Sequence, residues 1–391
     1  MYIVHIGVSC FPANNATAQR IRFTFKAVKE AGYTPLIINK QSIYSKLVSK
    51  KKINKFDGLI YLYTSPVLER PNGFVKRNIN KLRGIISELI LLYKKRKEID
   101  SAILYTPYFS DLFYYRIVSK ILGFKLVIQY VEYLSCIAYR DAFFTKINDN
   151  LFDKHCSKLC DGVIAISEFL KDDVHKIRPS VPILKIPAIC DFNDFEPKEN
   201  LPLNKSYFLY CGTVEYIPVI EFILTFFDKA KKQQLYDGKL ICIIGCNSAQ
   251  NFDEIDRLFE KSEYFNDIIL YKNLQYSQII PLYKKAELLL IPLRNNIQDI
   301  ARFPHKVSEY TASRRPLLST DIGELKYYFT DGTSALLADE YDVDKYVETL
   351  SKFRKAGRSF DCIGEEGYQV GYKNFHYLQN VPAIQSFFKS L

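Results

Sequence analysis

Short apolar runs alternate along the chain with segments in which apolar residues recur at helical spacing. In the first half, the runs that predict strands lie at 2–8, 36–39, 59–63, 102–106 and 125–131. After the first run, Ile21, Phe25 and Val28 mark a helix that breaks at Gly32. Strands that alternate with helices in this way are typical of a parallel, doubly wound sheet.

A second series of the same kind follows a polar, proline-bearing segment at 196–206, which predicts a linker. Before that linker, 160–176 reads as a strand, then Ser167 as a helix N-cap, then an amphipathic helix. Beyond it, the runs that predict strands lie at 208–212, 239–245, 267–271, 287–293, 316–320 and 334–338. The sequence therefore predicts the α/β class with two domains, which agrees with a length of 391 residues.

The segment 74–98 differs from the rest because a strong apolar stripe is flanked by lysine and arginine clusters. The stripe consists of Phe74, Ile79, Leu82, Ile85, Ile86, Leu89 and Leu92. It could lie in a membrane interface, with its basic residues on lipid phosphates. Core helices carry such stripes as a rule, so packing of the stripe on the sheet is the expectation and the membrane interface the alternative.

Composition indicates a globular protein, with 48% apolar and 25% charged residues. No apolar run approaches the roughly 20 residues that cross a bilayer, and the apolar start without a basic leader predicts a first strand and no signal peptide. The first hundred residues carry 19 basic against 6 acidic residues, whereas the remainder carries 35 against 37. This basic excess suits an anionic partner such as a membrane surface, a phospholipid-linked substrate or nucleic acid, unless it only keeps the surface soluble.

The nine cysteines are scattered. Two groups could suggest a metal site, His155 with Cys156 and Cys160, and Cys242 with Cys246, but neither has the paired C-x-x-C spacing of a zinc site. They predict buried thiols in a reducing cytoplasm and no metal site. No G-x-G-x-x-G or P-loop motif occurs, which argues against a standard dinucleotide or P-loop site.

The stretch FPHKVSEYTASRRPLLSTDIGE at 303–324 combines several features of a ligand site. Phe303 and Pro304 precede a predicted helix that ends near Ser313, and its free N–H groups attract phosphate. Lys306 and Glu309 share one face near its start, so a cation for phosphate is followed by an acceptor for a ribose diol. A surface ion pair between these two residues is the alternative. The preceding strand with its polar loop, and the following TDIGE turn, should bring loops to one sheet edge, where open α/β sheets bind ligands.

At 303–337 the sequence resembles the donor-site signature of retaining glycosyltransferases of family four. Weaker similarities lie at 6–33, 161–174, 210–216 and 374–391. The resemblance implies the GT-B architecture, two Rossmann-like domains that face a central cleft. An acceptor-binding domain would span 1–198 with a returning helix at about 370–391, and a donor-binding domain would span 205–368. It further implies sugar transfer from a nucleotide-diphosphate sugar with retained configuration, in the biosynthesis of capsular or other surface polysaccharides.

The same resemblance assigns roles to particular residues. Glu309 matches the second glutamate of the E-x7-E motif, which binds the donor ribose, while the first falls at Ala301. The family's diphosphate-binding arginine would follow Gly212, where this chain has Thr213. Arg294, Arg302 or Lys306 must then hold the diphosphate. The full predicted donor set is Gly212, Thr213, Gly245, Arg294, Arg302, Phe303, Pro304, His305, Lys306 and Glu309.

On the acceptor side, Glu132 aligns with a histidine that lies near the acceptor sugar in many members. Glu132 and Lys306 are the predicted catalytic residues, and Glu324 is a further candidate for positioning hydroxyl groups. The altered N-terminal loop contributes Asn15, Ala16 and Arg20. Without a D-x-D motif we expect no metal ion, so fixed cations and helix N-termini would stabilise the leaving group.

Three other functions remain open at this stage. The same architecture serves sugar-nucleotide epimerases. The absence of the family's arginine after Gly212, and of the lysine that follows it a few residues on in the family, would also fit a weak or inactive nucleotide-sugar-binding homologue. A nucleic-acid-binding role would use the basic half and the 57 Tyr and Phe residues, but no RNA-binding motif is present and we expect none. We expect a cytoplasmic enzyme without a cofactor, with a lipid-linked or oligosaccharide acceptor and with peripheral attachment to an anionic inner membrane face as an option.

Overall fold

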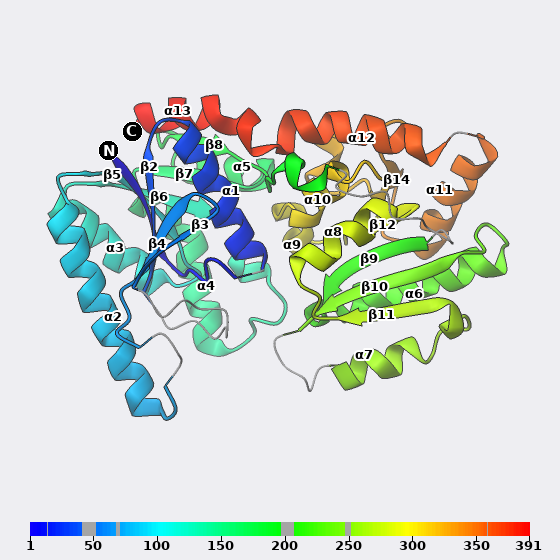
Figure 1. Ribbon diagram of the computed structural model, residues 1–391, viewed down its shortest axis with the longest axis horizontal. Coiled ribbons are helices and arrows are strands. Elements are labelled where there is room, and N and C mark those ends of the chain that lie inside the picture. The colour runs from blue at the N-terminus through cyan, green and yellow to red at the C-terminus, as the bar shows by residue number, and fades with distance from the viewer. Residues whose placement is uncertain (14, 41–51, 68–70, 197–206, 247–251, 358) are drawn as a thin grey trace. The chain divides into compact units, whose positions relative to one another are not determined.

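The computed structural model describes residues 1–13, 15–40, 52–67, 71–196, 207–246, 252–357 and 359–391. These residues form two compact units (Figure 1). Unit 1 comprises Met1–Cys190 and Tyr377–Leu391, and unit 2 comprises Asp191–His376. Apart from Glu196, the linker predicted at 196–206 lies outside the described residues.

Unit 1 is built on an eight-stranded sheet with the order β3-β4-β2-β1-β5-β6-β7-β8. Its strands are β1 Tyr2–Gly7, β2 Thr34–Asn39, β3 Ile53–Phe56, β4 Leu59–Tyr63, β5 Ile99–Tyr105, β6 Lys125–Tyr130, β7 Gly162–Ala165 and β8 Ile183–Lys185. All neighbours pair in parallel except β3 and β4. The five apolar runs and the strand before Ser167 are confirmed. The sequence analysis missed only the two edge strands β3 and β8, which are short and carry no buried apolar run.

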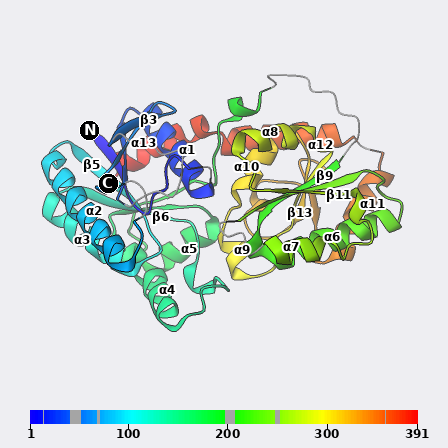
Figure 2. The ribbon, with the colours of Figure 1, turned by 60° about the horizontal axis from the view of Figure 1, so that its bottom comes forward.

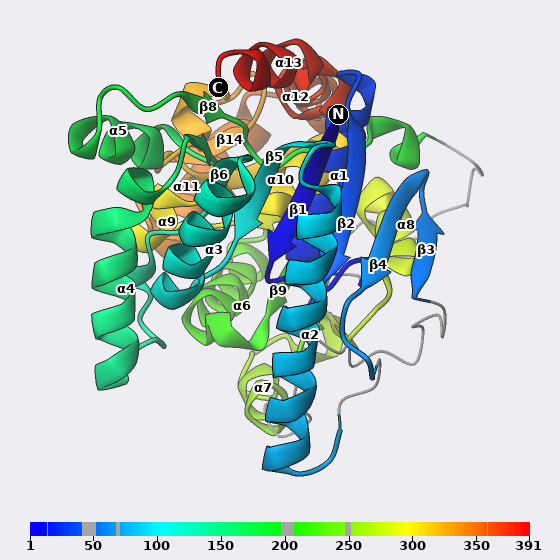
Figure 3. The same cartoon turned by 90° about the vertical axis from the view of Figure 1, so that its left-hand side faces the viewer.

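Helices cover both faces of this sheet. One layer contains α1 Ala16–Glu30 and α13 Val381–Lys389, which pack on each other. Right-handed crossovers place α2 Phe74–Lys95, α3 Phe109–Leu122, α4 Phe143–His155 and α5 Glu168–Ile177 on the opposite face (Figure 3). Ser167 caps α5, as predicted, because its side chain accepts a hydrogen bond from the Leu170 amide. Within the described residues, no helix combines the length and apolarity needed to cross a bilayer.

Helix α2 corrects one prediction, because its apolar stripe does not pack on the sheet. The buried face consists of Asn80, Gly84, Glu88 and Leu92, and of the predicted stripe only Leu92 is fully buried. Two polar contacts hold this face. The Asn80 side chain donates to Ser65 Oγ over 2.8 Å, and Glu88 accepts from the Tyr115 hydroxyl over 2.8 Å. A β-carbon at Gly84 would lie 2.3 Å from the Lys40 carbonyl oxygen, so only glycine allows this close approach.

Unit 2 has a six-stranded, fully parallel sheet with the order β11-β10-β9-β12-β13-β14. Its strands are β9 Tyr207–Thr213, β10 Lys239–Gly245, β11 Ile268–Lys272, β12 Leu288–Ile291, β13 Leu317–Thr320 and β14 Leu336–Ala338. All six predicted strands are confirmed. The strand order reverses between β9 and β12, which is the topological switch point where such sheets bind ligands.

The helices of unit 2 also form two layers (Figure 2). One layer contains α6 Ile217–Lys232, α7 Phe252–Phe259 and α11 Val343–Lys355. The other contains α8 Tyr276–Lys285, α10 His305–Ala312 and α12 Phe360–Phe375, while the short α9 Ile297–Ala301 precedes α10. The main core lies between the sheet and the first layer, around Phe208, Phe226 and Phe227.

Three glycines let α12 lie directly against its neighbours. A β-carbon at Gly364, Gly367 or Gly371 would fall within 2.3–2.8 Å of Arg314, Ser334 or Thr311, respectively. Thr311 belongs to α10, so the close approach of α12 sets where α10 sits.

Candidate functional site

The predicted donor residues of unit 2 gather at the switch point. Gly212 and Thr213 end β9, and Gly245 pairs with Thr213 at the end of β10. The loop after β12 carries Arg294 and leads through α9 to Phe303 and Pro304, with Pro304 as the residue before α10. Because all these strands are parallel, the loops share one edge of the sheet.

Helix α10 begins where it was predicted and places Lys306 and Glu309 beside the end of β9. Both charges lie close enough to affect the pKa of the Cys211 thiol. Burial raises this pKa, the positive charge of Lys306 lowers it, and the negative charge of Glu309 raises it. The surface ion pair between Lys306 and Glu309 does not form. Instead, Glu309 Oε1 lies 3.3 Å from His305 Nδ1, and Glu309 is only 7% exposed.

The Lys306 ammonium has no hydrogen bond and no ion pair with any described residue, although Lys306 is half-buried. A half-buried cation without a partner, in the first turn of a helix at a switch point, is suited to an anionic ligand. His305 contributes a second polar atom there, because its Nε2 is buried and has no partner in the described chain.

The loop between β12 and α10 is organised by Asp299, which the sequence analysis did not single out. Asp299 is fully buried and accepts from Arg294 Nε over 2.9 Å and from the Arg294 amide over 2.8 Å. Arg302 Nη2 lies 2.8 Å from the other carboxylate oxygen. Asn296 caps α9 by accepting from the Asp299 amide. One carboxylate therefore fixes two guanidinium groups, and its hydrogen bond and charge raise the pKa of Arg294.

Both of these arginines pack against the ring of Tyr216. Their guanidinium carbons lie 4.7 Å (Arg302) and 5.6 Å (Arg294) from the centre of its ring, and Arg302 also donates to the Tyr216 hydroxyl. Tyr216 follows β9 by three residues, close to where the resemblance puts the family's diphosphate-binding arginine. The sequence lacks that arginine at 213, but the fold brings two others to the same loop.

The TDIGE turn packs against α9. Gly323 has φ +65°, and a β-carbon there would lie 3.1–3.3 Å from backbone atoms of Asp299 and Ile300. Thr320 Oγ1 donates to the Leu293 carbonyl over 2.6 Å and so ties the ends of β12 and β13 together. Glu324 is almost fully buried and has a partner, and Phe303 packs on Phe375, so both lie inside unit 2.

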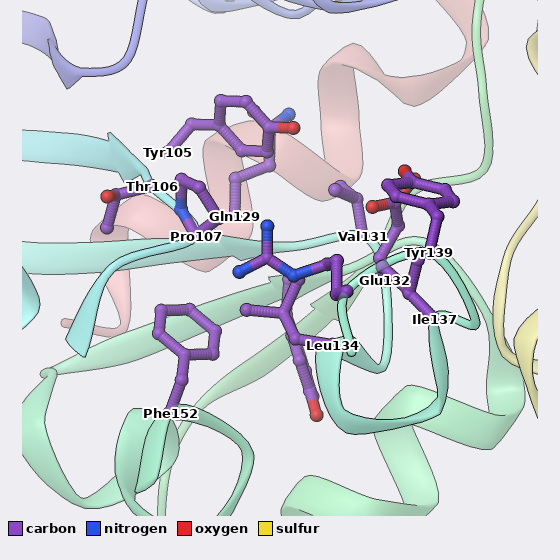
Figure 4. Close-up of a pocket in the computed structure, with 12 residues that line it drawn as sticks. Tyr105, Thr106, Pro107, Gln129, Val131, Glu132, Leu134, Ile137, Tyr139 and Phe152 are labelled. Atoms are coloured by element: carbon purple, nitrogen blue, oxygen red, sulfur yellow. The ribbon is translucent and has the colours of Figure 1, made fainter. Parts of the chain in front are cut away.

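In unit 1, a cavity of about 170 Å³ lies at the carboxyl ends of β5 and β6 (Figure 4). It is lined by Tyr105, Thr106, Pro107, Gln129, Tyr130, Val131, Glu132, Leu134, Ile137, Tyr139, Arg140 and Phe152. Glu132 is thus in the cavity wall, where the resemblance places the acceptor. Gln129 is 6% exposed, and within the described residues the side chains of Gln129 and Glu132 have no hydrogen-bond partner. Arg140 is fixed by Asp149 at 2.6 and 2.7 Å, which raises the Arg140 pKa.

The other predicted acceptor-side residues are only partly associated with this cavity. The Asn15 side chain caps α1 by accepting a hydrogen bond from the Ala18 amide over 2.9 Å. Ala16 is exposed at the start of α1. The guanidinium carbon of Arg20 lies 4.7 Å from the ring centre of Tyr105, which lines the cavity. The Arg20 Nε atom is buried and has no hydrogen-bond partner in the described chain.

The cysteines form no disulfide and no metal cluster. All nine are free, and five of them are buried as expected, whereas Cys362 in α12 is exposed. Among the described residues, no three His, Cys, Asp or Glu side chains come close enough to hold a metal ion.

Comparisons with known proteins agree with this fold. Residues 191–370 match the family model described as glycosyl transferases group 1. Among solved structures, sucrose-phosphate synthase from Thermosynechococcus elongatus matches with a TM-score of 0.75 and 13% identity, over 100% of this chain and 98% of that one. Anabaena HepE in complex with UDP-glucose matches with a TM-score of 0.70 and 11% identity, over the full length of both chains. The catalytic domain of Arabidopsis thaliana starch synthase IV, bound to ADP and acarbose, matches with a TM-score of 0.70 and 10% identity, over 100% and 99%.

No curated protein sequence matches the chain significantly. The structural similarity to these solved structures establishes the fold, although the sequence identities are low. The family match covers unit 2 up to residue 370. The predicted architecture is confirmed: the chain has the GT-B fold of two parallel-sheet α/β domains, and its second domain is similar to the group 1 glycosyl transferases.

Proposed function

We propose that the protein is a glycosyltransferase whose unit 2 binds a nucleotide-diphosphate sugar. The observation that carries this proposal is the unpartnered Lys306 ammonium beside the His305–Glu309 pair, at the start of α10 and at the switch point. The match of residues 191–370 to glycosyl transferases group 1 supports it independently.

Each group in this site has a place along the donor. The α10 N-terminus and Lys306 would hold the diphosphate, and Glu309 would accept hydrogen bonds from the ribose diol one turn further on. Arg294 and Arg302 would add positive charge from the neighbouring loop. Asp299 holds both rigidly, so they need little reorganisation when negative charge develops on the leaving group.

We infer that the reaction retains the anomeric configuration and uses these fixed cations instead of a metal ion. The bond between the anomeric carbon and the diphosphate oxygen breaks, and the acceptor oxygen bonds to that carbon on the same face. The acceptor's proton passes to the departing diphosphate, whose charge is stabilised by Lys306 and the α10 N-terminus. No protein nucleophile is needed in this route.

The acceptor is proposed to occupy the unit 1 cavity. Glu132 and Gln129 offer unpartnered polar groups to sugar hydroxyls, and Arg140 adds a positive charge held in place by Asp149. A cavity of about 170 Å³ accommodates part of a saccharide and not a whole lipid. We therefore propose a saccharide acceptor, carried on a lipid, as in the assembly of a surface polysaccharide.

Thermal unfolding in the presence of UDP-, GDP-, CMP- and dTDP-linked sugars tests donor binding. A donor at a hundred times its dissociation constant should stabilise the protein by about 2.7 kcal/mol, which raises the unfolding midpoint measurably. Free nucleosides are the control. If none of the nucleotide sugars raises the midpoint more than its nucleoside does, the proposal is wrong.

A donor-only incubation then separates transfer from other chemistry on the same fold. A transferase leaves the donor sugar intact except for slow hydrolysis, whereas an epimerase changes the sugar without any acceptor. Chromatography of the recovered nucleotide sugar distinguishes the two, and a changed sugar would contradict the proposal.

A further inference from the structure

Helix α2 presents its apolar side to the outside of unit 1. Its buried residues recur every fourth position from Asn80 to Leu92, and two of the four are polar. The opposite side carries Val75, Ile79, Leu82, Ile86, Ile90 and Tyr93, all exposed. An ordinary surface helix has the reverse arrangement, because burial of the apolar side is what holds it to the core.

The two neighbouring helices of the same layer continue this apolar surface. Helix α3 exposes Phe113, Ile117 and Ile121, and α4 exposes Phe143, Phe144 and Ile147. The exposed fractions reach 76% for Ile121 and 82% for Phe144. Helix α3 packs on both α2 and α4, so the three lie side by side over one face of the sheet (Figure 3). Below, these exposed residues of α2, α3 and α4 are called the outer face.

An apolar surface that extends over three helices marks an interaction site, whereas single exposed apolar residues need no explanation. Burying it would remove several large side chains from water at once, and this favours a partner with an apolar interior. The charges around the outer face indicate which partner that is.

Positive charge surrounds the α2 stripe. Lys76, Lys81, Arg83, Lys94 and Lys97 are exposed, and none of them forms an ion pair within the described chain. The single acidic residue of α2 is Glu88, which is buried. A second copy of this chain would bring like charges together across the interface. Nucleic acid would satisfy the charges but would leave the aliphatic stripe in contact with water.

A bilayer containing anionic lipid satisfies both properties. Aliphatic and aromatic side chains can enter the interface while lysine and arginine stay at the level of the phosphates. Tyrosine is well suited to that depth, which is where Tyr93 would lie.

The unit 1 cavity lies at the same edge of the sheet from which α2 and α4 start. Both helices begin after the carboxyl ends of β4 and β6, and the cavity lies at the ends of β5 and β6. Tyr139 lines the cavity, is largely exposed, and precedes Phe143 by four residues. A membrane against the outer face would therefore lie near the cavity mouth.

We propose that the outer face of α2, α3 and α4 docks unit 1 onto an anionic membrane surface. The apolar side chains enter the interface, and the basic residues of α2 contact lipid phosphates. The protein attaches to one leaflet, without a spanning segment. This inference goes beyond the enzymatic proposal and does not depend on it, because membrane binding is measured without donor or acceptor.

Vesicle co-sedimentation of the full chain tests the proposal. The protein should sediment with phosphatidylcholine vesicles that contain phosphatidylglycerol, and much less with phosphatidylcholine alone. The triple variant Ile79→Ser, Leu82→Ser, Ile86→Ser should bind about a thousandfold more weakly, because each buried aliphatic side chain contributes about tenfold. The residues are exposed, so the thermal unfolding midpoint of this variant should not fall.

A second triple variant tests the charges. Lys76→Gln, Lys81→Gln, Arg83→Gln should weaken binding to the anionic vesicles by about fivefold per removed charge. The matched control is Lys261→Gln, Lys352→Gln, Lys355→Gln, which removes the same charge from exposed positions of unit 2 and should bind like the unchanged protein.

Three results would overturn the proposal. The first is absence of binding to anionic vesicles, and the second is equal binding by the serine variant and the unchanged protein. The third is a dimer in solution that the serine variant converts to a monomer, which would assign the outer face to a second copy. Full donor binding alongside absent vesicle binding would leave the enzymatic proposal intact, so the two proposals can fail separately.

Discussion

Both units are built on a doubly wound sheet, but the basic residues of the loop after β12 and those of α2 are held differently. In unit 2, Arg294 and Arg302 are held inside the site loop by the buried Asp299. In unit 1, the exposed lysine and arginine side chains of α2, Lys76, Lys81, Arg83 and Lys94, form no ion pair within the described chain. They flank an apolar stripe. The two arrangements match the two partners proposed above, a donor diphosphate for unit 2 and a lipid surface for unit 1. Fixed cations suit a small anion that must be oriented, whereas free cations suit a broad surface that needs no orientation.

The strongest test of this contrast removes the carboxylate of unit 2. Asp299→Asn should lower the free energy of unfolding by about 3 kcal/mol, because two partly buried guanidinium groups lose their counter-charge. Urea unfolding measures the loss. Asp361→Asn is the matched control, since Asp361 pairs with Arg315 but is 80% exposed, and its loss should cost less than about 1 kcal/mol. Equal effects of the two variants would contradict the central role of Asp299.

The buried Glu88 on the inward face of α2 should make the stability of the protein depend on pH. Burial raises the pKa of Glu88 to about 7 from its ordinary value near 4.5. The folded protein therefore holds this proton over a range in which the unfolded chain has lost it. The stability contributed by the neutral carboxyl is complete below pH 4.5 and is lost as pH rises to 7 and beyond.

Glu88→Gln should abolish this dependence. Between pH 4.5 and 8, the unchanged protein should lose up to roughly 3 kcal/mol more stability than the variant. Urea unfolding at a series of pH values gives the difference. Parallel stability curves for the two proteins would mean that Glu88 is charged in the fold.

The role of the unpartnered Lys306 ammonium is tested by Lys306→Ala. Turnover should fall by about a hundredfold, as expected when one preorganised charge contact to the leaving group is lost. The unfolding midpoint should not change, because Lys306 makes no ion pair with the described residues. Lys261→Ala, at an exposed position of the same unit, is the activity control. Normal turnover in the Lys306 variant would remove Lys306 from the site.

Much of the fold could be predicted from the sequence because buried parallel strands read as continuous apolar runs. The start of α10 was also predictable, since Phe303-Pro304 and the Lys306–Glu309 spacing are local signals. The role of Asp299 could not be predicted from the sequence, because it depends on how Arg294, Arg302 and Tyr216 converge in three dimensions. Periodicity revealed the stripe of α2 but not its direction. That direction is set by the Gly84 approach to Lys40 and by the partners of Asn80 and Glu88, which come from elsewhere in the chain.

The three glycines of α12 have a consequence for any survey of this protein's variants. Helix α10, which carries Lys306 and Glu309, rests on a helix that approaches so closely only because Gly364, Gly367 and Gly371 lack side chains. The position of the candidate site on α10 thus depends on glycines that lie outside that site and that are unfavourable for a helix. A side chain added at residues 364–371 would therefore displace α10, and with it Lys306 and Glu309, without changing any residue of the candidate site.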